Sequence, residues 1–361
     1  ACLFFSKKVL NLDLLSRISA FKIIFISPIF FSIISSIIFL ILSVHLFIII
    51  SFSFSKNDFL IASLKEHYAS IILNKSGNTL QGDELVKFLM PANKAIIGIE
   101  AITDSLLSQL PNLHVISKYG VGLNNLDLKA MKARGIKLGF TPGVNKQSVA
   151  ELALTLMLTG LRKIHGNNLD ILNGNWSQEK GSELYGKTIG LLGFGNIGTK
   201  LAELIQPFKC NILFFDEREH THQDIADIAS ELNLDSELIH QASLKTVLNE
   251  SDILSIHLPL LPETENIISI NELNQLKPNI CIINTARGGV VNEDHLHSFL
   301  LSNPHAFAGF DVYQEEPALN NPLFTLPNFF GTSHRSSLTN EGINSMGMAA
   351  INGLDDNIYI T

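Results

Sequence analysis

The sequence is poor in the residues that build disulfide frameworks and zinc sites. Its 361 residues include only three cysteines, far apart from one another, and no C-x-x-C pair or Cys/His cluster occurs. We therefore expect no metal site, and a reducing, cytoplasmic compartment fits best. Cys210 and Cys281 stand beside apolar runs and are expected to fill the core.

Charge is also scarce, and its balance is negative. Asp, Glu, Lys and Arg make up 17% of the residues, and the formal net charge is -8 at pH 7. An acidic surface repels nucleic acid and anionic lipid, so neither is expected as a partner. It also repels anionic small molecules, so a carboxylate substrate would need a local cation.

A long stretch near the N-terminus contains no Asp, Glu, Lys or Arg. It runs from Ile23 to Ser55 and exceeds the roughly 20 apolar residues that span a bilayer, so a membrane anchor is one interpretation. Pro28 and many serines interrupt it, however, and the basic residues before it would send the rest of the chain out of the cytosol. We favour a non-functional extension over residues 1–45, with any membrane contact limited to residues 23–45.

From about residue 46 onward, short apolar segments alternate with helical patterns. Strands separated by helices of about ten residues are typical of a parallel α/β sheet. After a first strand within 46–54, the pattern predicts strands over 69–73, 94–99, 114–118 and 136–140, and helices over 83–89, 104–110 and 128–134.

A long helix is expected from Ser148 to about Ile164, with Ser148 and Glu151 spaced as a capping box. This helix is apolar nearly all round, so it should be buried between domains or at a subunit contact. A second α/β series follows, in which Ser269 and Glu272 form another capping box. Its five strands, which predict a doubly wound sheet, are expected over 188–192, 211–215, 253–257, 280–284 and 306–310.

The first strand of this second series leads into the pattern G-x-G-x-x-G, formed by Gly193, Gly195 and Gly198. These glycines allow a tight turn, the approach of a pyrophosphate to the backbone and close packing of the following helix. The next strand ends at Asp216, whose carboxylate would accept the ribose hydroxyls and repel a 2′-phosphate. The sequence therefore predicts a Rossmann-type domain that binds NAD, while Arg218 leaves NADP open.

Arg287, Glu316 and His334 lie just after strands of the second series, where ligands bind in open α/β sheets. This set suits hydride transfer at the hydroxylated carbon of an acid. A histidine can carry the hydroxyl proton, a carboxylate beside it orients the ring, and an arginine holds the substrate carboxylate with a two-point fork.

The stretch from about Leu46 to Asp355 resembles the D-2-hydroxyacid dehydrogenases, the family that contains phosphoglycerate, lactate and glycerate dehydrogenases. Six ordered motifs make the resemblance specific. They are KYGVGLNNLD (118–127), TPGVNKQSVAELAL (141–154), GKTIGLLGFGNIG (186–198), HLPLLPET (257–264), INTARGGVVNED (283–294) and FDVYQEEP (310–317).

The resemblance implies that Arg287 binds the substrate carboxylate and that His334, supported by Glu316, is the catalytic acid/base. It also implies that the loop after the third strand of the first series contacts substrate, largely through backbone N–H groups. The implied substrate contacts are Lys118, Tyr119, Gly120, Val121 and Gly122, and the implied cofactor contacts, besides the three glycines and Asp216, are Asn196, Ile197, Pro259, Thr264, Thr285, Ala286 and Asp311.

The resemblance further implies two domains. Residues 46–147, completed by 335–361, would form a flavodoxin-like substrate domain, and residues 148–334 the NAD-binding domain. A homodimer or homotetramer is expected, since members of the family are commonly dimers or tetramers.

Two departures from the family pattern bear on the substrate. His334 is followed by Arg335-Ser336-Ser337 instead of a form like Ile-Gly-Gly, and Ile97-Gly98 stands where some phosphoglycerate enzymes have Arg-Ser. The second departure removes an expected phosphate ligand, for which Lys118 is a candidate replacement. A phosphoglycerate dehydrogenase-like activity is the main expectation. The alternatives are a glyoxylate/hydroxypyruvate-type reductase and an NAD-sensing, co-repressor-like binding protein on the same fold.

Overall fold

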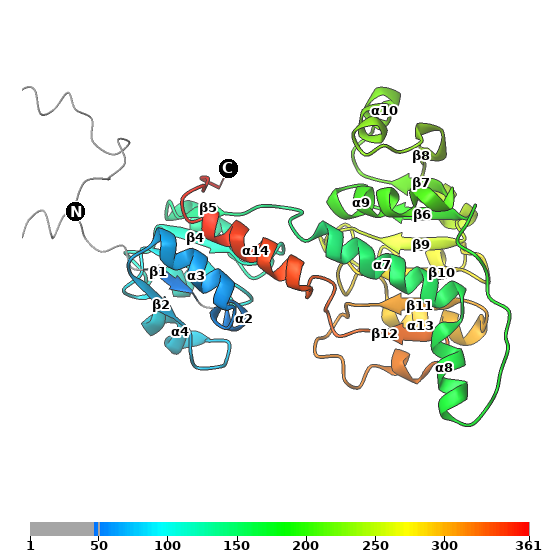
Figure 1. Cartoon of the computed structure of the whole chain (residues 1–361), viewed down its shortest axis with the longest axis horizontal. Helices are drawn as coiled ribbons and strands as arrows, with labels where there is room; N and C mark the ends of the chain where they lie inside the picture. The colour runs from blue at the N-terminus through cyan, green and yellow to red at the C-terminus, as the bar shows by residue number, and fades with distance from the viewer. Residues whose placement is uncertain (1–46, 50, 361) are drawn as a thin grey trace, which may run out of the picture. The chain divides into compact units, whose positions relative to one another are not determined.

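The computed structural model describes residues 47–49 and 51–360, and in this part of the chain strands and helices alternate (Figure 1). They form two distinct parallel sheets, one of five strands and one of seven. This confirms the predicted α/β class with two parallel, doubly wound sheets. The expectations for residues 1–45 lie outside the described residues. Within the described ranges, no helix combines the length and apolar character needed to cross a bilayer.

The five-stranded sheet has the strand order β2-β1-β3-β4-β5, with every neighbouring pair parallel. This order, 2-1-3-4-5, is that of flavodoxin-like sheets, as expected. The first strand of the described residues is therefore an inner strand. The strands are β1 (Phe47–Ile49), β2 (Ile71–Leu73), β3 (Lys94–Ile97), β4 (Val115–Lys118) and β5 (Lys137–Gly139).

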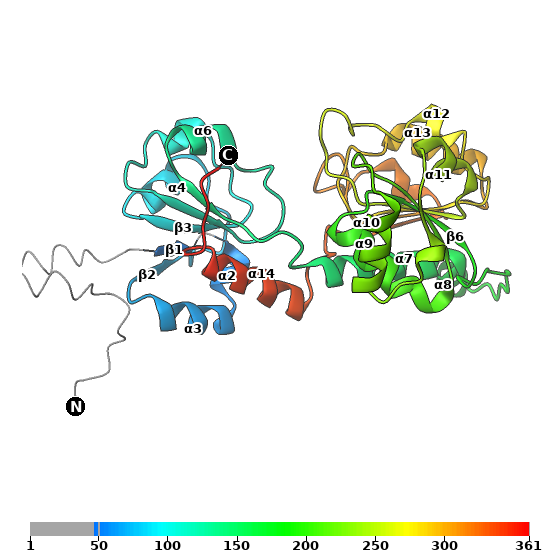
Figure 2. The same ribbon diagram turned by 90° about the horizontal axis from the view of Figure 1, so that it is seen from above.

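Helices cover both faces of this sheet, with α4 and α6 on one side and α2, α3 and α14 on the other (Figure 2). α14, near the C-terminal end of the chain, packs against this sheet. Ser117 Oγ of β4 donates to Ala350 O of α14 at 2.6 Å. Gly347 lets α14 approach α3, because a Cβ there would lie 2.2 Å from a methyl of Leu60. The helices are α2 (Phe52–Ser55), α3 (Asp58–His67), α4 (Gly82–Leu89), α5 (Asp104–Leu107), α6 (Leu128–Ala133) and α14 (Asn340–Asn352).

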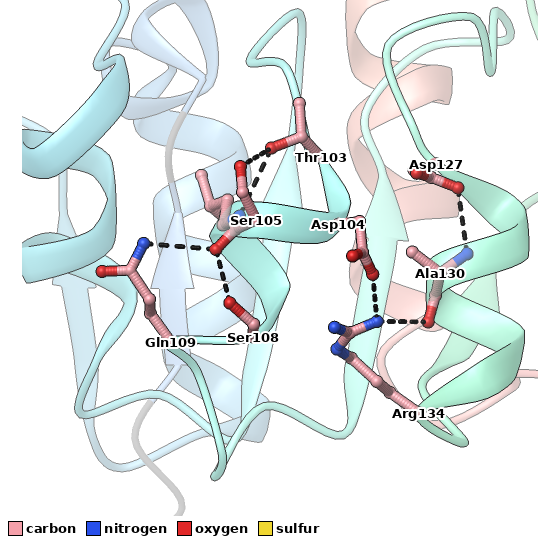
Figure 3. Close-up of polar contacts among 9 residues, drawn as sticks. Thr103, Asp104, Ser105, Ser108, Gln109, Asp127, Ala130 and Arg134 are labelled. Atoms are coloured by element: carbon pink, nitrogen blue, oxygen red, sulfur yellow. Dashed lines mark hydrogen bonds and ion pairs between the residues drawn. The ribbon is translucent and has the colours of Figure 1, made fainter.

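Polar contacts fix the short helices that follow β3 and β4 (Figure 3). The Thr103 hydroxyl caps α5 by accepting an N–H from its first turn, and Asp127 caps α6 in the same way. Arg134, at the end of α6, forms an ion pair with Asp104 at the start of α5. The segments at the carboxyl ends of these two strands are thus held in defined positions.

The seven-stranded sheet has the order β8-β7-β6-β9-β10-β11-β12, again all parallel. It is the Rossmann order 3-2-1-4-5-6 with one strand added at the far edge. Figure 2 shows α7, α9 and α10 on one face and α11, α12 and α13 on the other. The strands are β6 (Thr188–Leu192), β7 (Asn211–Phe215), β8 (Ile239–Gln241), β9 (Ile253–Ile256), β10 (Cys281–Asn284), β11 (Phe307–Phe310) and β12 (Phe329–Gly331).

The expectation of five strands in this sheet was too low, because β8 and β12 were missed. Each has only three residues and lies at an edge of the sheet. In β8 only Ile239 is buried, so the segment has no continuous apolar run to identify it. The inner strands begin and end within two residues of their predicted bounds, and Cys210 and Cys281 are buried in the core, as predicted.

The long helix α7 (Lys146–Leu161) begins earlier than predicted, and the capping box at its start is wrong. Ser148 lies inside the first turn, where its hydroxyl is 2.8 Å from that of Thr339, and Glu151 bonds Gln147 instead. The chain then turns at Lys163, with φ +53°, into a separate helix, α8 (Ile164–Leu172).

α7 is buried, as its apolar sequence predicts, and its buried face packs on the seven-stranded sheet; the expected place between domains or at a subunit contact stays a prediction. Ala150, Ala153, Leu156 and Met157 belong to the same buried cluster as strands β6 and β10. The second capping box, Ser269 with Glu272, is confirmed at the start of α12. The remaining helices of this sheet are α9 (Asn196–Ile205), α10 (His222–Glu231), α11 (Leu244–Glu250), α12 (Ile270–Leu273) and α13 (Glu293–Ser302).

Candidate active site

The glycine loop joins β6 to α9 with the geometry that a dinucleotide requires. Gly193 has φ +96°, and a Cβ there would lie 2.8 Å from the backbone oxygen of His257. A Cβ on Gly198 would lie 2.3 Å from Gly193 O, so α9 packs directly on the loop. Gly195, by contrast, has open space where its Cβ would be. A pyrophosphate can therefore reach the backbone at Gly195 and the N-terminus of α9.

Asp216 lies one residue beyond β7 and is tied to this loop. Its Oδ2 accepts the Phe194 N–H at 2.8 Å, and its Oδ1 accepts the Arg218 N–H at 3.1 Å. Arg218, the cation that left NADP open, directs its guanidinium to Asp224 at 3.4 Å. A carboxylate at this position suits ribose hydroxyls and repels a 2′-phosphate, which favours NAD.

The other expected cofactor contacts lie at the carboxyl ends of β9 and β10. The Thr264 hydroxyl donates to Pro259 O at 2.6 Å and so shapes the loop after β9. The Thr285 hydroxyl is buried, and no residue in the described part of the chain bonds it. Burial of a polar atom without a partner is costly, so an orphaned hydroxyl just after β10 fits a bound cofactor. Asn196 and Ile197 form the first turn of α9, and Ala286 follows Thr285.

Asp311, also expected to contact the cofactor, is buried and already has three donors. It accepts the Thr332 hydroxyl and the backbone N–H groups of Arg335 and Ser336, at 2.9 and 2.8 Å. These bonds fix the loop that carries His334. A cofactor contact by Asp311 stays a prediction, whereas its bonds within the protein are those of a loop anchor.

His334 and Glu316 meet as the sequence predicts. His334 Nδ1 lies 2.7 Å from Glu316 Oε2, and Glu316 Oε1 accepts the Tyr313 N–H at 3.1 Å. With a carboxylate as its acceptor, Nδ1 carries a proton, and Nε2 is left to exchange one with a ligand. Glu315, the neighbouring carboxylate, is exposed, and it is Glu316 that bonds this histidine.

The backbone of His334 adopts a conformation that the sequence does not reveal. Its φ is +48°, in the left-handed region that few residues other than glycine adopt. Its N–H donates to Asp311 O at 2.9 Å, so the anchor described above also holds this residue. The histidine ring is thereby presented at a fixed place beside β11.

Arg287 follows β10, where Asn284 turns the chain by accepting the Ala286 N–H and donating to Arg287 O, both at 3.0 Å. The guanidinium donates to Ala286 O at 2.6 Å. A Cβ on Gly122 would lie 2.8 Å from Arg287 Nη2, so the arginine reaches the loop after β4. Burial lowers the pKa of Arg287, and the charge of Glu316 opposes this shift.

The loop after β4 offers backbone groups next to this arginine. Gly120 has φ +122°, a conformation that favours glycine. Within the described ranges, the N–H groups of Gly120, Val121 and Gly122 donate to no protein acceptor. Tyr119 differs, because its N–H donates to Ile97 O at 2.8 Å and its ring packs edge-on against Phe54 in the core.

Lys118 is buried, and its ammonium is held by two acceptors. It donates to Asn125 Oδ1 at 2.7 Å and to Gly98 O. The pKa of Lys118 is lowered to about 8, chiefly by burial. The positive charge of Arg287 also lowers this pKa, and the negative charge of Glu100 opposes the shift. Glu100 and Asn125 were not predicted as site residues. Glu100 could have been found, since it follows β3 on the sheet edge where Lys118 ends β4.

Comparison with known proteins identifies the family. Residues 154–336 match the model of the D-isomer specific 2-hydroxyacid dehydrogenase, NAD binding domain. The chain is 32% identical over 299 residues to hydroxypyruvate reductase of Thermotoga maritima, covering 80% of this chain and 94% of that protein. It is 32% identical over 271 residues to D-3-phosphoglycerate dehydrogenase of Methanocaldococcus jannaschii, covering 74% of this chain but 50% of that protein. The chain thus spans about half the length of this second relative.

Among solved structures, D-lactate dehydrogenase of Escherichia coli superimposes with a TM-score of 0.68 at 26% identity, covering 84% of this chain and 93% of that one. The chain belongs to the D-isomer specific 2-hydroxyacid dehydrogenase family. It is an NAD-dependent oxidoreductase, which agrees with the open glycine loop and with Asp216 beside it.

Proposed function

We propose that this chain transfers a hydride between NAD and C2 of a small D-2-hydroxy acid or the matching 2-keto acid. The observation that carries the proposal is the pairing of His334 with Glu316 at 2.7 Å, together with an arginine, Arg287, that reaches the loop after β4. An acid/base for the hydroxyl proton and a cation for the carboxylate are the two groups that this reaction requires.

In this proposal each residue has one task. When bound, NAD supplies or accepts the hydride. Arg287 holds the substrate carboxylate, assisted by the N–H groups of Gly120 to Gly122. His334 Nε2 gives a proton to the keto oxygen in reduction and takes it back in oxidation. Glu316 keeps the imidazole oriented by accepting from Nδ1.

The sequence predicts a phosphoglycerate dehydrogenase-like activity and leaves open which 2-hydroxy acid reacts. A second candidate, hydroxypyruvate or glyoxylate, is favoured by the environment of Lys118. This lysine is the proposed replacement for the missing phosphate ligand, yet two of its three N–H donors are already engaged by Gly98 and Asn125. A doubly charged phosphate would need more donors than the remaining one, whereas a hydroxyl would not.

The test is NADH oxidation with a panel of 2-keto acids that includes hydroxypyruvate, glyoxylate, pyruvate and phosphohydroxypyruvate. We expect turnover, with hydroxypyruvate preferred to its phosphorylated form. The matched control is Arg287→Ala, which should bind NADH but lose activity. An NAD-sensing, co-repressor-like protein would instead bind NADH without turnover of any acid, and that result would refute the enzyme proposal.

Two further expectations belong to the same proposal. A cytoplasmic location would give the enzyme access to the cellular NADH pool.

A homodimer or homotetramer is supported by the apolar surface of α8, where Ile164, Ile171 and Leu172 are exposed beside Trp176, which is 82% exposed. Since Trp176 is the single tryptophan of the chain, its fluorescence should shift to the blue if this surface is covered on association.

A further inference from the structure

A buried acid, Glu100, lies outside the predicted catalytic set. It stands three residues beyond β3 and is 1% exposed. Its Oε2 accepts the Gly98 N–H at 2.9 Å, whereas no partner for Oε1 exists in the part of the chain that the structure describes. Such a group is costly to bury, so its presence calls for a compensating charge or a function.

The compensating charge is Lys118, from the neighbouring strand β4. Gly98 links the two side chains, because its N–H donates to Glu100 and its carbonyl accepts from the Lys118 ammonium. Asn125 closes the cluster by accepting from Lys118 and donating to the carbonyl of Glu100 at 2.6 Å. We call Gly98, Glu100, Lys118 and Asn125 the lysine clamp.

The lysine clamp lies against the site described above. A Cβ on Gly120 would lie 3.8 Å from Lys118 Cε, and the charge of Arg287 acts on the Lys118 ammonium. An ammonium has three N–H donors, two of which end on Gly98 and Asn125. The third N–H of the Lys118 ammonium is therefore available to a ligand whose carboxylate Arg287 holds.

We propose that Glu100 is a positioning residue that keeps Lys118 charged and oriented, so that its third N–H binds an oxygen on C3 of the substrate. This inference rests on the proposed function and names the substrate class more narrowly. The class is 2-keto acids that carry a hydroxyl on C3, as hydroxypyruvate does. These should be preferred to acids whose C3 is a methyl group, as in pyruvate. Glu100 touches no substrate in this account and acts only through Lys118.

The charged groups that act on Lys118 predict a pH dependence. Glu100 supports its charged form, while burial and Arg287 oppose it, and the pKa is lowered to about 8. The KM for hydroxypyruvate should therefore rise as the pH increases through about 8, and the KM for pyruvate should not. In Glu100→Gln the supporting charge is gone, so the rise should begin at lower pH.

The experiment compares hydroxypyruvate with pyruvate in Glu100→Gln, Lys118→Met and the double variant. Glu100→Gln should raise the KM for hydroxypyruvate about tenfold and Lys118→Met about 10- to 100-fold, in each variant by more than the KM for pyruvate rises. In the Lys118→Met background, Glu100→Gln should add nothing, because it acts through the lysine. Glu84→Gln, an exposed glutamate in α4, is the matched control.

The outcomes separate this inference from the proposed function. If the parent enzyme turns over no 2-keto acid, the proposed function is wrong. If it turns over both acids and Glu100→Gln changes their KM values equally, or adds to Lys118→Met, the positioning role is wrong. Should Glu100→Gln fail to fold, the parent's own pH profiles decide, since equal alkaline rises for hydroxypyruvate and pyruvate would overturn the inference.

Discussion

The two sheets build their binding surfaces in different ways. In the seven-stranded sheet the loop from Gly193 to Gly198 offers backbone groups, and the side chain that supports it, Asp216, is the residue just after the next strand. In the five-stranded sheet the loop after β4 also offers backbone groups, but the lysine clamp adds two buried side chains, Glu100 and Lys118, which the backbone of Gly98 and the half-buried Asn125 hold together. A binding loop made of backbone groups is contiguous, so its motif can be recognised in the sequence. A cluster of side chains from separate segments cannot be recognised in this way, because it depends on which segments meet in the fold.

The difference has a chemical reason. A dinucleotide presents a pyrophosphate, which backbone N–H groups at a helix N-terminus can bind whatever the substrate is. A small acid is distinguished by the group on its C3, and only side chains of chosen length and charge recognise that group. The cofactor surface should therefore tolerate few changes, and the substrate surface should determine which acid reacts.

The largest effect is expected at His334. His334→Ala removes the proton carrier, so kcat for keto-acid reduction should fall by roughly 10²–10⁴, with little change in NADH binding. Steady-state kinetics and NADH fluorescence titration measure both quantities. The matched control is Glu315→Gln, whose side chain is exposed and does not bond His334. A kcat for His334→Ala within tenfold of the parent would exclude the acid/base role.

The next effect is expected at Arg287. Arg287→Ala removes a two-point contact with the carboxylate, which should cost on the order of 3–5 kcal/mol, or a few hundredfold and more in kcat/KM, much of it through KM. Arg287→Lys should not restore activity, because an ammonium cannot form the fork. Recovery of most of kcat/KM in the lysine variant would show that only the charge matters at this position.

Local patterns in the sequence pointed to several of the contacts that the structure shows. The glycine loop, Asp216 and the pairing of His334 with Glu316 were all identified, since strand ends in a parallel sheet meet on one edge. The inner strands were also identified, because each is a continuous buried run, as in β9 and β10.

What the sequence did not reveal depends on contacts between distant segments. Ser148 was interpreted as a helix cap, but its hydroxyl meets Thr339, which no local pattern indicates. The positive φ of His334 follows from the bonds that Asp311 makes with its loop. Glu100 was missed because an acid after a strand is usually solvated, and only the approach of Lys118 gives it a role.

A moderate effect is expected at Asp216, on the cofactor side. The parent should prefer NADH to NADPH, because the carboxylate favours ribose hydroxyls and repels a phosphate. Asp216→Ala should reduce that preference on the order of tenfold in kcat/KM, by loss of charged hydrogen bonds. Arg218→Ala is the control, since its guanidinium is directed to Asp224. Equal or better kcat/KM with NADPH in the parent would contradict the assignment.

The smallest effect is expected from removing residues 1–46. A chain that begins at Phe47 keeps all of β1, in which Phe47 pairs with Ile71 of β2 on one side and Lys94 of β3 on the other. It should fold and keep kcat/KM within roughly twofold of the parent, because no described element is lost.

The matched control begins at Ser51 and differs by only four residues. It lacks β1, so β2 and β3 lose the strand between them, and the carboxyl end of β3 that leads into the lysine clamp loses its support. This shorter chain should fail to fold, as circular dichroism and NADH-dependent turnover would show. If the chain that begins at Phe47 also fails to fold, or if the full chain is recovered in active form only from membranes, residues 1–45 are part of the functional protein and not an extension.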